Sequence, residues 1–275
     1  MNVDQFFRVT ALPHAGETVL GSAVATEPGG KGGNQAVAAA RAGADVQFVG
    51  AIGTDPAGAR LRAHLSADGV GLEGLQELTV ASGSAVILVD DHGENMIVVA
   101  PGANGHLTLS SAAARAVIAD CEVLLVQLEV PIATAVGAAR EARSVGATVI
   151  VNASPVSTDP GLGDLADVTD VVIVNEAEEP HWAWPTRHFV VTRGARGASY
   201  RGPDGDVDVP SPEVEAIDTT GAGDVFAGVL ASAWAAGHER ALRRACAAGA
   251  LATLVSGAGD CAPVAESIDD VLTQY

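Results

Sequence analysis

Asp218-Thr219-Thr220-Gly221-Ala222-Gly223-Asp224, followed at once by the apolar run Val225–Leu230, is the stretch around which the chain is organised. Glycines at the point where a loop becomes a helix let the backbone approach a ligand closely. The free N–H groups of a first helical turn carry the positive end of the helix dipole and can bind a phosphate or a developing anion. Asp224 at the mouth of such a site is well placed to take a proton from a hydroxyl that attacks phosphorus. A plain helix N-cap is the competing interpretation of so short a string.

A second glycine-rich loop, Pro28–Asn34, runs into the alanine-rich segment Gln35–Ala40. It is not a Walker A loop, because Lys31 is followed by Gly32 rather than by Ser or Thr. A flexible loop capped by Asn34 is the simplest interpretation of this stretch when it is taken alone.

The rest of the chain alternates between predicted strands and helices, beginning with a strand at Asp45–Gly53 and a helix at Asp55–Leu65. This alternation predicts a parallel sheet covered on both faces. Polar residues just past the carboxyl ends of such strands line the ligand crevice. Glu129, Asn175 and Glu178 lie at such positions, and each is equally explained as a helix cap.

Composition limits the possible functions of the 275-residue chain. With 48% hydrophobic and 4% aromatic residues, it predicts one large α/β domain, or one domain with a small appendage, and a core of Ala, Val and Leu. A net charge of −19 argues against nucleic acid or an anionic membrane as a general partner. Three widely spaced cysteines predict neither a disulfide framework nor a zinc site. The lack of a signal sequence and of a spanning apolar run predicts a cytoplasmic protein.

A separate small sheet is predicted from short strands outside the alternating pattern. Phe6–Val9 and Glu17–Leu20 are expected to form two strands, and Ser84–Val89 with Asn95–Val99 a hairpin. Asn2 and Asp4 alternate along the first of these segments, so on a strand they face the same way.

The two glycine-rich stretches together resemble the two signatures of the ribokinase (phosphofructokinase-B) family of sugar kinases, in the family's order. D-T-T-G-A-G-D-x-F matches the C-terminal signature and G-G-K-G-x-N-Q-A the N-terminal one, and the resemblance extends from Asn2 to about Pro263. It implies an α/β fold with a parallel-sheet, three-layer core over 25–80 and 101–275. It also implies a small β lid over 1–24 and 81–100, which covers the sugar and pairs two subunits into a homodimer.

The resemblance implies ATP-dependent phosphorylation of D-ribose at O5, with Asp224 as base and the N–H groups of Gly221, Ala222 and Gly223 as an anion hole. Kinases for fructose, a deoxy sugar acid or a nucleoside, and a sugar-binding pseudokinase without catalysis, are the alternatives. The sugar-binding residues carried over from the family are Asn2, Asp4, Gly30, Lys31, Asn34, Glu129 and Asp224.

The implied cofactors are ATP, Mg²⁺ and an activating K⁺. Glu178 would organise Mg²⁺ through water, as suits a hard cation that keeps its hydration shell. The nucleotide would lie on Asn175, Thr192, Arg193, Gly194, Ala195, Arg196, Gly197, Gly223 and Cys246. The monovalent-cation loop would comprise Asp218, Thr220, Ala252, Val255, Gly257 and Cys261, several of them through backbone carbonyls.

Three departures from the family pattern carry structural expectations. Relatives have a core strand before Asn2-Val3-Asp4, so the first core strand is predicted to be missing, which would leave unpaired backbone groups. Only Glu179–Arg187 joins two predicted elements where the family usually has helices, so one sheet face is expected to be less covered. Cys246 replaces a polar residue near adenine and is more typical of a small core residue. Cys261 replaces a common serine near the cation, although sulfur is a poor ligand for a hard ion.

Overall fold

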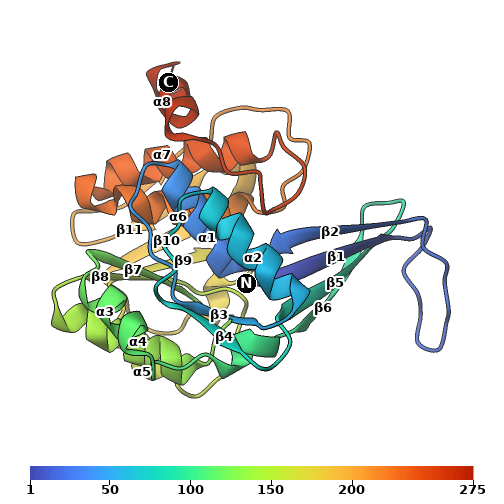
Figure 1. Cartoon of the computed structure of the whole chain (residues 1–275). Helices are drawn as coiled ribbons and strands as arrows, with labels where there is room; N and C mark the ends of the chain where they lie inside the picture. The colour runs from blue at the N-terminus through green and yellow to red at the C-terminus, as the bar shows by residue number, and fades with distance from the viewer. Residues whose placement is uncertain (275) are drawn as a thin grey trace.

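The computed structural model describes residues 1–274, in which a layered body carries a projecting sheet (Figure 1). The larger sheet of the body contains β7 (Val123–Gln127), β8 (Thr148–Asn152), β9 (Val171–Asn175), β10 (His188–Thr192), β11 (Ala198–Arg201) and β12 (Val207–Val209). Their order in the sheet is β12-β11-β10-β9-β8-β7. The strands from β7 to β10 are parallel, whereas β11 and β12 continue antiparallel.

Helices cover both faces of this sheet, which confirms the predicted three-layer α/β core (Figure 1). One face packs against α3 (Ala112–Ala119), α4 (Ile132–Ser144) and α5 (Leu162–Ala166). The other face packs against α6 (Ala222–Ala233) and α7 (His238–Ala252). Burial on both sides explains why β8 and β9 are unbroken runs of Val and Ile at their centres.

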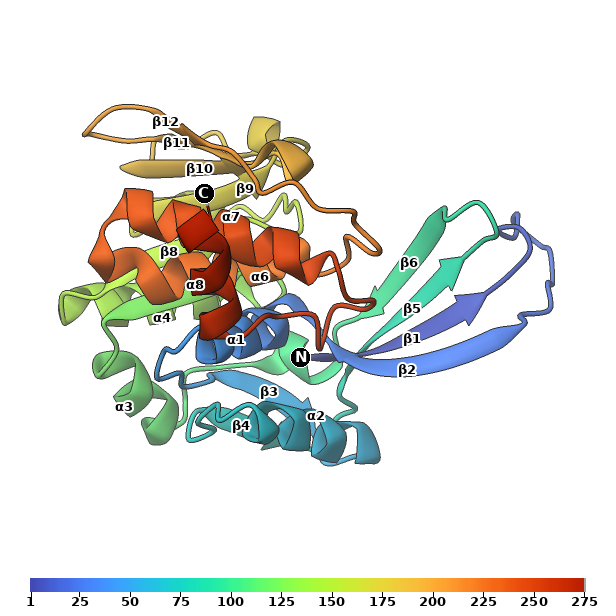
Figure 2. The same cartoon turned by 90° about the horizontal axis from the view of Figure 1, so that it is seen from above.

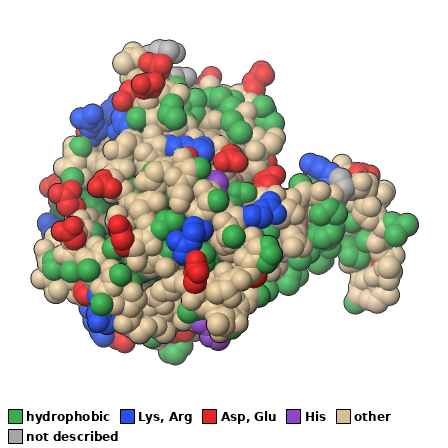
Figure 3. Space-filling view, viewed as in Figure 1, with side chains coloured by type: hydrophobic (Ala, Val, Ile, Leu, Met, Phe, Trp, Pro, Cys, Tyr) green, Lys and Arg blue, Asp and Glu red, His purple; other side chains and the backbone are tan. Residues whose placement is uncertain are grey.

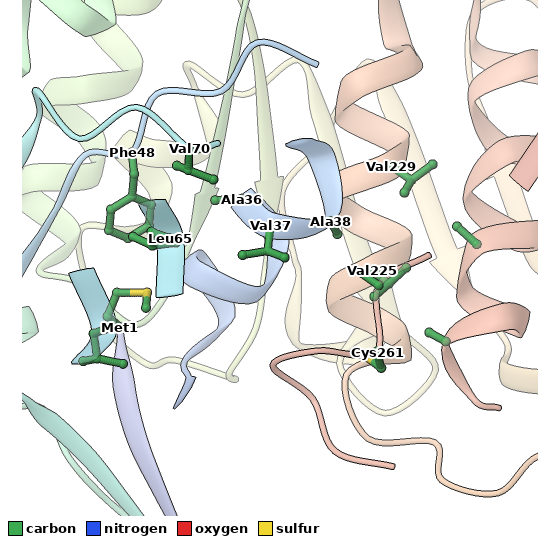
Figure 4. Packing of buried hydrophobic residues seen from close by; sticks show 14 of the residues in the cluster. Met1, Ala36, Val37, Ala38, Phe48, Leu65, Val70, Val225, Val229 and Cys261 are labelled. Carbon is green, nitrogen blue, oxygen red and sulfur yellow. The ribbon is translucent and has the colours of Figure 1, made fainter. Parts of the chain in front are cut away.

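A second part of the body surrounds α1 (Lys31–Arg41), and its apolar residues form one cluster with α6 (Figure 4). α1 and α6 pack so closely that a Cβ at Gly228 would lie 2.3 Å from the Gln35 carbonyl oxygen. This contact explains the small residues of both helices, and it places the start of α1 beside the start of α6. The remaining elements here are α2 (Pro56–Ala67), α8 (Ala265–Gln274), β3 (Gly50–Gly53), β4 (Leu75–Leu78) and the 3₁₀ turn η1 (Gly102–His106). Three further 3₁₀ turns belong to the part with the larger sheet: η2 (Glu179–His181) follows β9, η3 (Gly194–Arg196) follows β10 and η4 (Trp234–Ala236) follows α6.

The core sheet is interrupted between β3 and β7. β3 pairs only with β4, in a separate two-stranded parallel sheet, and β7 pairs only with β8. Val123, Leu124 and Leu125 on β7 are correspondingly only partly buried, whereas the central residues of β8 are fully buried. Among residues 1–274, no strand pairs with the free edge of β7 or joins the two-stranded sheet to the six-stranded one.

The projecting sheet, which we call the lid, contains β1 (Asn2–Arg8), β2 (Ala23–Gly29), β5 (Gly83–Val89) and β6 (Asn95–Ala100), in the order β2-β1-β5-β6 (Figure 2). The expected hairpin of β5 and β6 is confirmed. The strand expected at Glu17–Leu20 is wrong, because this segment is an exposed loop and the partner of β1 begins at Ala23. Since β2 pairs with β1 as far as Gly29, the lid continues beyond residue 24 on this strand.

The short connection at Glu179–Arg187 covers the sheet in an unexpected way. Trp182 is buried against the α4 and α5 side of the core, and its ring meets that of Trp184 edge-on with centroids 5.3 Å apart. Trp182 Nε1 donates a hydrogen bond to Thr186 Oγ1 at 3.0 Å. Two indole rings thus cover surface that the sequence predicted to be less covered. Within the described residues, no helix is long and apolar enough to cross a membrane.

Candidate active site

The first turn of α6 lies in a tight, glycine-dependent connection. Gly221 precedes it with φ 80°, and a Cβ there would lie 2.8 Å from Ala258 Cα. No side chain of the described residues caps this turn, so the capping interpretation of Asp218–Asp224 does not account for it. A Cβ at Gly223 would meet open space, which leaves room for an anion in front of the turn.

Asp224, on the first turn of α6, is 9% exposed and accepts hydrogen bonds on both carboxylate oxygens. Asn34 Nδ2 donates to Oδ2 at 3.1 Å, and Gln35 Nε2 donates to Oδ1 at 2.9 Å. Both donors come from the start of α1, which the α1–α6 contact brings across the core. The carboxylate is therefore held in one orientation at the first turn of α6.

The predicted sugar-binding residues gather beside Asp224. Glu129 follows β7, and its Oε2 accepts from the backbone N–H of Lys31 at 2.9 Å. Gly30 precedes α1 with φ 88°, where a Cβ would lie 2.8 Å from Asn2 N. Asn2 is buried, and its Oδ1 accepts from Asn104 Nδ2 at 2.8 Å. The start of β1 and the loop before α1 thus close one side of the site.

Asp4 carries an unusual buried charge. Its Oδ1 is buried without a hydrogen-bond partner among the described residues. Burial, and then the charge of Glu129, raise the pKa of Asp4 to about 6. A buried carboxylate oxygen without a partner is costly, and a sugar hydroxyl would supply the missing donor.

Of the predicted nucleotide residues, Asn175 and the segment 192–197 lie together at the carboxyl ends of β9 and β10, where Asn175 pairs with Thr192. Gly223 lies on the first turn of α6 and Cys246 on α7, so the structure does not place these two at the strand ends. Asn175 Oδ1 accepts from the N–H groups of Ala177 and Glu178, and Glu178 Oε2 accepts from the N–H of Asn175 at 2.9 Å. Both therefore stabilise the turn after β9, as the capping interpretation expects. The other Glu178 oxygen makes no hydrogen bond within the described structure, so it remains available to a hydrated cation.

The segment from Thr192 to Gly197 forms a tight turn between β10 and β11, and includes Gly194 and Ala195. Arg193 Nη1 donates to Glu176 Oε1 at 3.0 Å, and Arg196 bonds the same oxygen. Gly197 has φ 92°, and a Cβ there would lie 2.0 Å from Val209 O. The two arginines thus link the β10–β11 turn to the turn after β9.

The predicted monovalent-cation residues also come together, beside Gly221. Asp218 Oδ2 accepts from Gly257 N at 2.9 Å and Asp218 Oδ1 from Thr220 N at 2.9 Å. Although burial favours the neutral acid, these hydrogen bonds lower the pKa of Asp218. Ala252 ends α7, and Val255 follows it in the loop that leads to Cys261.

The two cysteines at the predicted ligand sites are both buried. Burial raises the pKa of Cys261 to about 11 and that of Cys246 to about 12, so both thiols are protonated at neutral pH. Cys261 Sγ lies 3.4 Å from Ala258 O and 3.9 Å from Thr220 O. Cys246 packs in the core between α7 and Val209, as expected for a small core residue.

Sequence reasoning missed the buried amides behind Asp224. Gln35 and Asn152 are nearly inaccessible, and Gln127 contacts Gln35 from the end of β7. Asn104, which holds Asn2, was also missed. The available signal was a polar residue beside an apolar segment, as in α1, where Gln35 directly precedes the apolar run Ala36–Ala40.

Known proteins resemble this chain over most of its length. The sequence profile described as "pfkB family carbohydrate kinase" matches residues 1–265. The ribokinase of Bacillus subtilis (strain 168) is 35% identical over 275 residues, which span 95% of this chain and 93% of that protein. The ribokinase of Schizosaccharomyces pombe is 32% identical over 86% of this chain and 84% of that protein.

Solved structures agree with the fold. Arabidopsis thaliana ribokinase in complex with ribose and ATP has a TM-score of 0.89 and 27% identity, covering 98% of this chain and 96% of that one. Ribokinase from Thermotoga maritima also has a TM-score of 0.89 and 27% identity, covering 99% of this chain and 96% of that one.

Proposed function

The chain belongs to the pfkB family of carbohydrate kinases, and we propose that it transfers the γ-phosphoryl group of ATP to O5 of D-ribose, giving D-ribose 5-phosphate and ADP. The observation that best supports this reaction is the position of Asp224. Its carboxylate is buried and oriented at a helix N-terminus without a side-chain cap, and the predicted sugar-binding residues lie around it. The ribokinases of similar sequence support ribose as the sugar. The solved ribokinase with ribose and ATP supports both substrates.

Each group in the site has a role in this reaction. Asp4 and Glu129 hold sugar hydroxyls, because ionised carboxylates accept strong hydrogen bonds. Asp224 takes the proton of the attacking hydroxyl. The N–H groups of Gly221, Ala222 and Gly223 stabilise the charge on the transferring group. The ends of β9 and β10 hold the nucleotide, on the residues assigned to it above.

We assign Mg²⁺ to Glu178, whose second carboxylate oxygen is unpaired within residues 1–274. We assign K⁺ to the two segments that meet beside Gly221, which are 218–220 before α6 and 252–261 after α7. Mg²⁺ supplies charge neutralisation on the phosphates when it is bound. Backbone carbonyls suit K⁺, whereas the protonated Cys261 thiol does not. Three free thiols support a reducing compartment, and we place the protein in the cytoplasm.

A coupled assay of ADP release with Mg-ATP tests the proposed function. Ribose is expected to support turnover, whereas deoxyribose, fructose and adenosine are expected to do so at least ~10-fold less well in kcat/KM, since each changes a hydrogen-bonding group. K⁺ is expected to raise the rate. ATP titrated into the folded protein is the control. Absence of ATP binding, with and without ribose, would reject the kinase in favour of a sugar-binding protein.

The pH dependence of sugar binding is expected to follow Asp4. The ionised carboxylate of Asp4 accepts a hydrogen bond from a sugar hydroxyl more strongly than the protonated acid does. As the pH falls from 7.5 to 5, Asp4 becomes protonated, and the KM for ribose should rise about tenfold. The folded-state pKa of about 6 lies above the unfolded value of 3.8, so the contribution of Asp4 to stability is lost as pH rises through 6.

The variant Asp4→Asn tests both statements. It should raise the Tm of the sugar-free protein at pH 8, and its KM for ribose should be high at every pH. A KM in the native protein that does not change between pH 7.5 and pH 5 would contradict the role of Asp4.

We also infer that the lid forms a homodimer. Directly opposed residues on its strands make an apolar face, consisting of Val24, Phe7, Leu88 and Met96 in one row and Val86 and Val98 in the next. Met96 is 43% exposed and Val98 64% exposed, and apolar side chains gather over the lid in Figure 3. β6 is in addition an edge strand. An exposed apolar sheet of this kind is typical of a protein interface.

Val98→Lys is expected to convert the dimer to a monomer, because it places a charge on that apolar face next to the edge of the sheet. Light scattering after size-exclusion chromatography measures the mass. Val145→Lys, which changes an exposed valine after α4, is the matched control and should leave the mass unchanged. A native protein that is monomeric at micromolar concentration would contradict the inference.

A further inference from the structure

A buried series of amide side chains connects the backbone of β9 to Asp224. Asn152 Nδ2 donates to the backbone oxygen of Ile173 at 3.2 Å, and Asn152 Oδ1 accepts from Gln35 Nε2 at 2.9 Å. The same Gln35 nitrogen donates to Asp224 Oδ1 at 2.9 Å. Gln35 Oε1 accepts from Gln127 Nε2 at 2.6 Å. β8, β7 and α1 each contribute one of these amides.

The direction of every bond in this series follows from its first member. A backbone carbonyl only accepts, so the nitrogen of Asn152 must face Ile173 and its oxygen must face Gln35. Gln35 must then turn its nitrogen toward Asn152, which leaves its second N–H for Asp224. Gln127 satisfies the remaining oxygen of Gln35. The sheet backbone thus determines that Asp224 faces a donor.

Gln35 is 1% exposed, so water cannot take its place beside the carboxylate. Both of its N–H groups and its oxygen have partners, and rotation of its amide would break all of these bonds. Asn34 donates to the other oxygen of Asp224, from a position beside the sugar site. Gln35 differs from Asn34 in its other partners, because Asn152 and Gln127 connect it to the strands β8 and β7 of the core sheet.

We propose that Gln35 is the positioning residue for Asp224: it aims the carboxylate toward the attacking hydroxyl. This proposal rests on the proposed function of Asp224 as the base. Without Gln35 the carboxylate keeps only the hydrogen bond from Asn34, so it can turn away from the hydroxyl and proton transfer becomes slower.

The test measures kcat and KM for ribose at pH 8, together with the Tm of each variant. Gln35→Met retains the length of the side chain and removes the amide. We expect kcat to fall about tenfold, because a misdirected base slows the chemical step, and KM for ribose to change less than about threefold. Gln35→Glu, whose carboxylate has no N–H to donate to Asp224, is expected to lower kcat at least as much.

Gln76→Met is the matched control, because Gln76 on β4 is partly exposed and donates to Thr108 O at 2.7 Å, away from Asp224. Its kcat and KM should equal those of the native protein. If Gln35→Met does not fold, Gln127→Met removes the donor to Gln35 Oε1 at a less buried position, and is expected to lower kcat by a smaller factor.

A lower Tm in Gln35→Met with kcat unchanged, or with KM for ribose raised by as large a factor as kcat falls, would overturn the proposal, because that is the result of a purely structural role. Failure of the proposed function looks different. In that case the native protein shows no ribose-dependent turnover, or Asp224→Asn retains the native rate.

Discussion

Asp224→Asn is expected to lower kcat by at least ~10²-fold, because the amide cannot accept the proton of the attacking hydroxyl. Ribose and ATP should still bind, since Asp4 and Glu129 hold the sugar and the ends of β9 and β10 hold the nucleotide. The neighbours of Asp224 add a second effect. Asn34 and Gln35 both donate to the carboxylate, so the new amide nitrogen would face a donor. Reorientation of one of these amides is expected to lower the Tm as well.

Kinetics and calorimetry on the same preparation separate the two effects. Steady-state rates across pH 6 to 9 give the loss in kcat, and titration of ribose into the variant shows that the folded site remains. Asp167→Asn, after α5 and remote from α6, serves as the matched control and should retain native turnover. A rate for Asp224→Asn close to the native one, with ribose binding preserved, would show that another group is the base.

Gly221→Ala is expected to have the second-largest effect. A side chain at φ 80° costs about 1–3 kcal/mol of backbone strain. The added Cβ would also lie 2.8 Å from Ala258 Cα and 3.0 Å from Cys261 Sγ, so the turn must move away from the cation loop. Displacement of the N–H groups at the start of α6 should reduce kcat by about 10²-fold, the order seen when one oxyanion donor is lost.

Gly237→Ala separates strain from displacement. Gly237 has φ 103° and precedes α7, but a Cβ there meets no atom within 4 Å. Both variants should lose stability by thermal denaturation, whereas only Gly221→Ala should lose turnover and respond less to K⁺. Equal turnover in the two variants would mean that the geometry of the α6 turn does not limit the reaction.

Local conformational requirements made much of the site visible in the sequence. Gly30 and Gly221 mark points where φ is positive and two backbones touch, and only glycine meets both conditions. Strand–helix alternation predicted the parallel sheet, because crossover connections place helices on both faces. The α6 turn, the loop before α1 and the strand ends were therefore recognisable before any contact was known.

The bounds of the lid strands and the packing of the segment after β9 were harder to predict from the sequence. Glu17–Leu20 has the composition of a strand, but strands form by pairing, and β1 instead pairs with Ala23–Gly29. Trp182 and Trp184 were recognised only as part of a short loop, although both pack against the α4 and α5 side of the core. Pairing and packing of this kind depend on partners far along the chain.

Local sequence was enough to predict the glycine-dependent turn before α6, the position of Asp224 beside it and the parallel sheet, because each depends on residues close together in the chain. The side chains that hold Asp224 were revealed only by the folded chain. Gln35 contacts Asn152 and Asp224 across 117 and 189 positions of sequence. A buried hydrogen bond needs a partner at a defined distance and angle, and chain folding, not chain order, provides that partner.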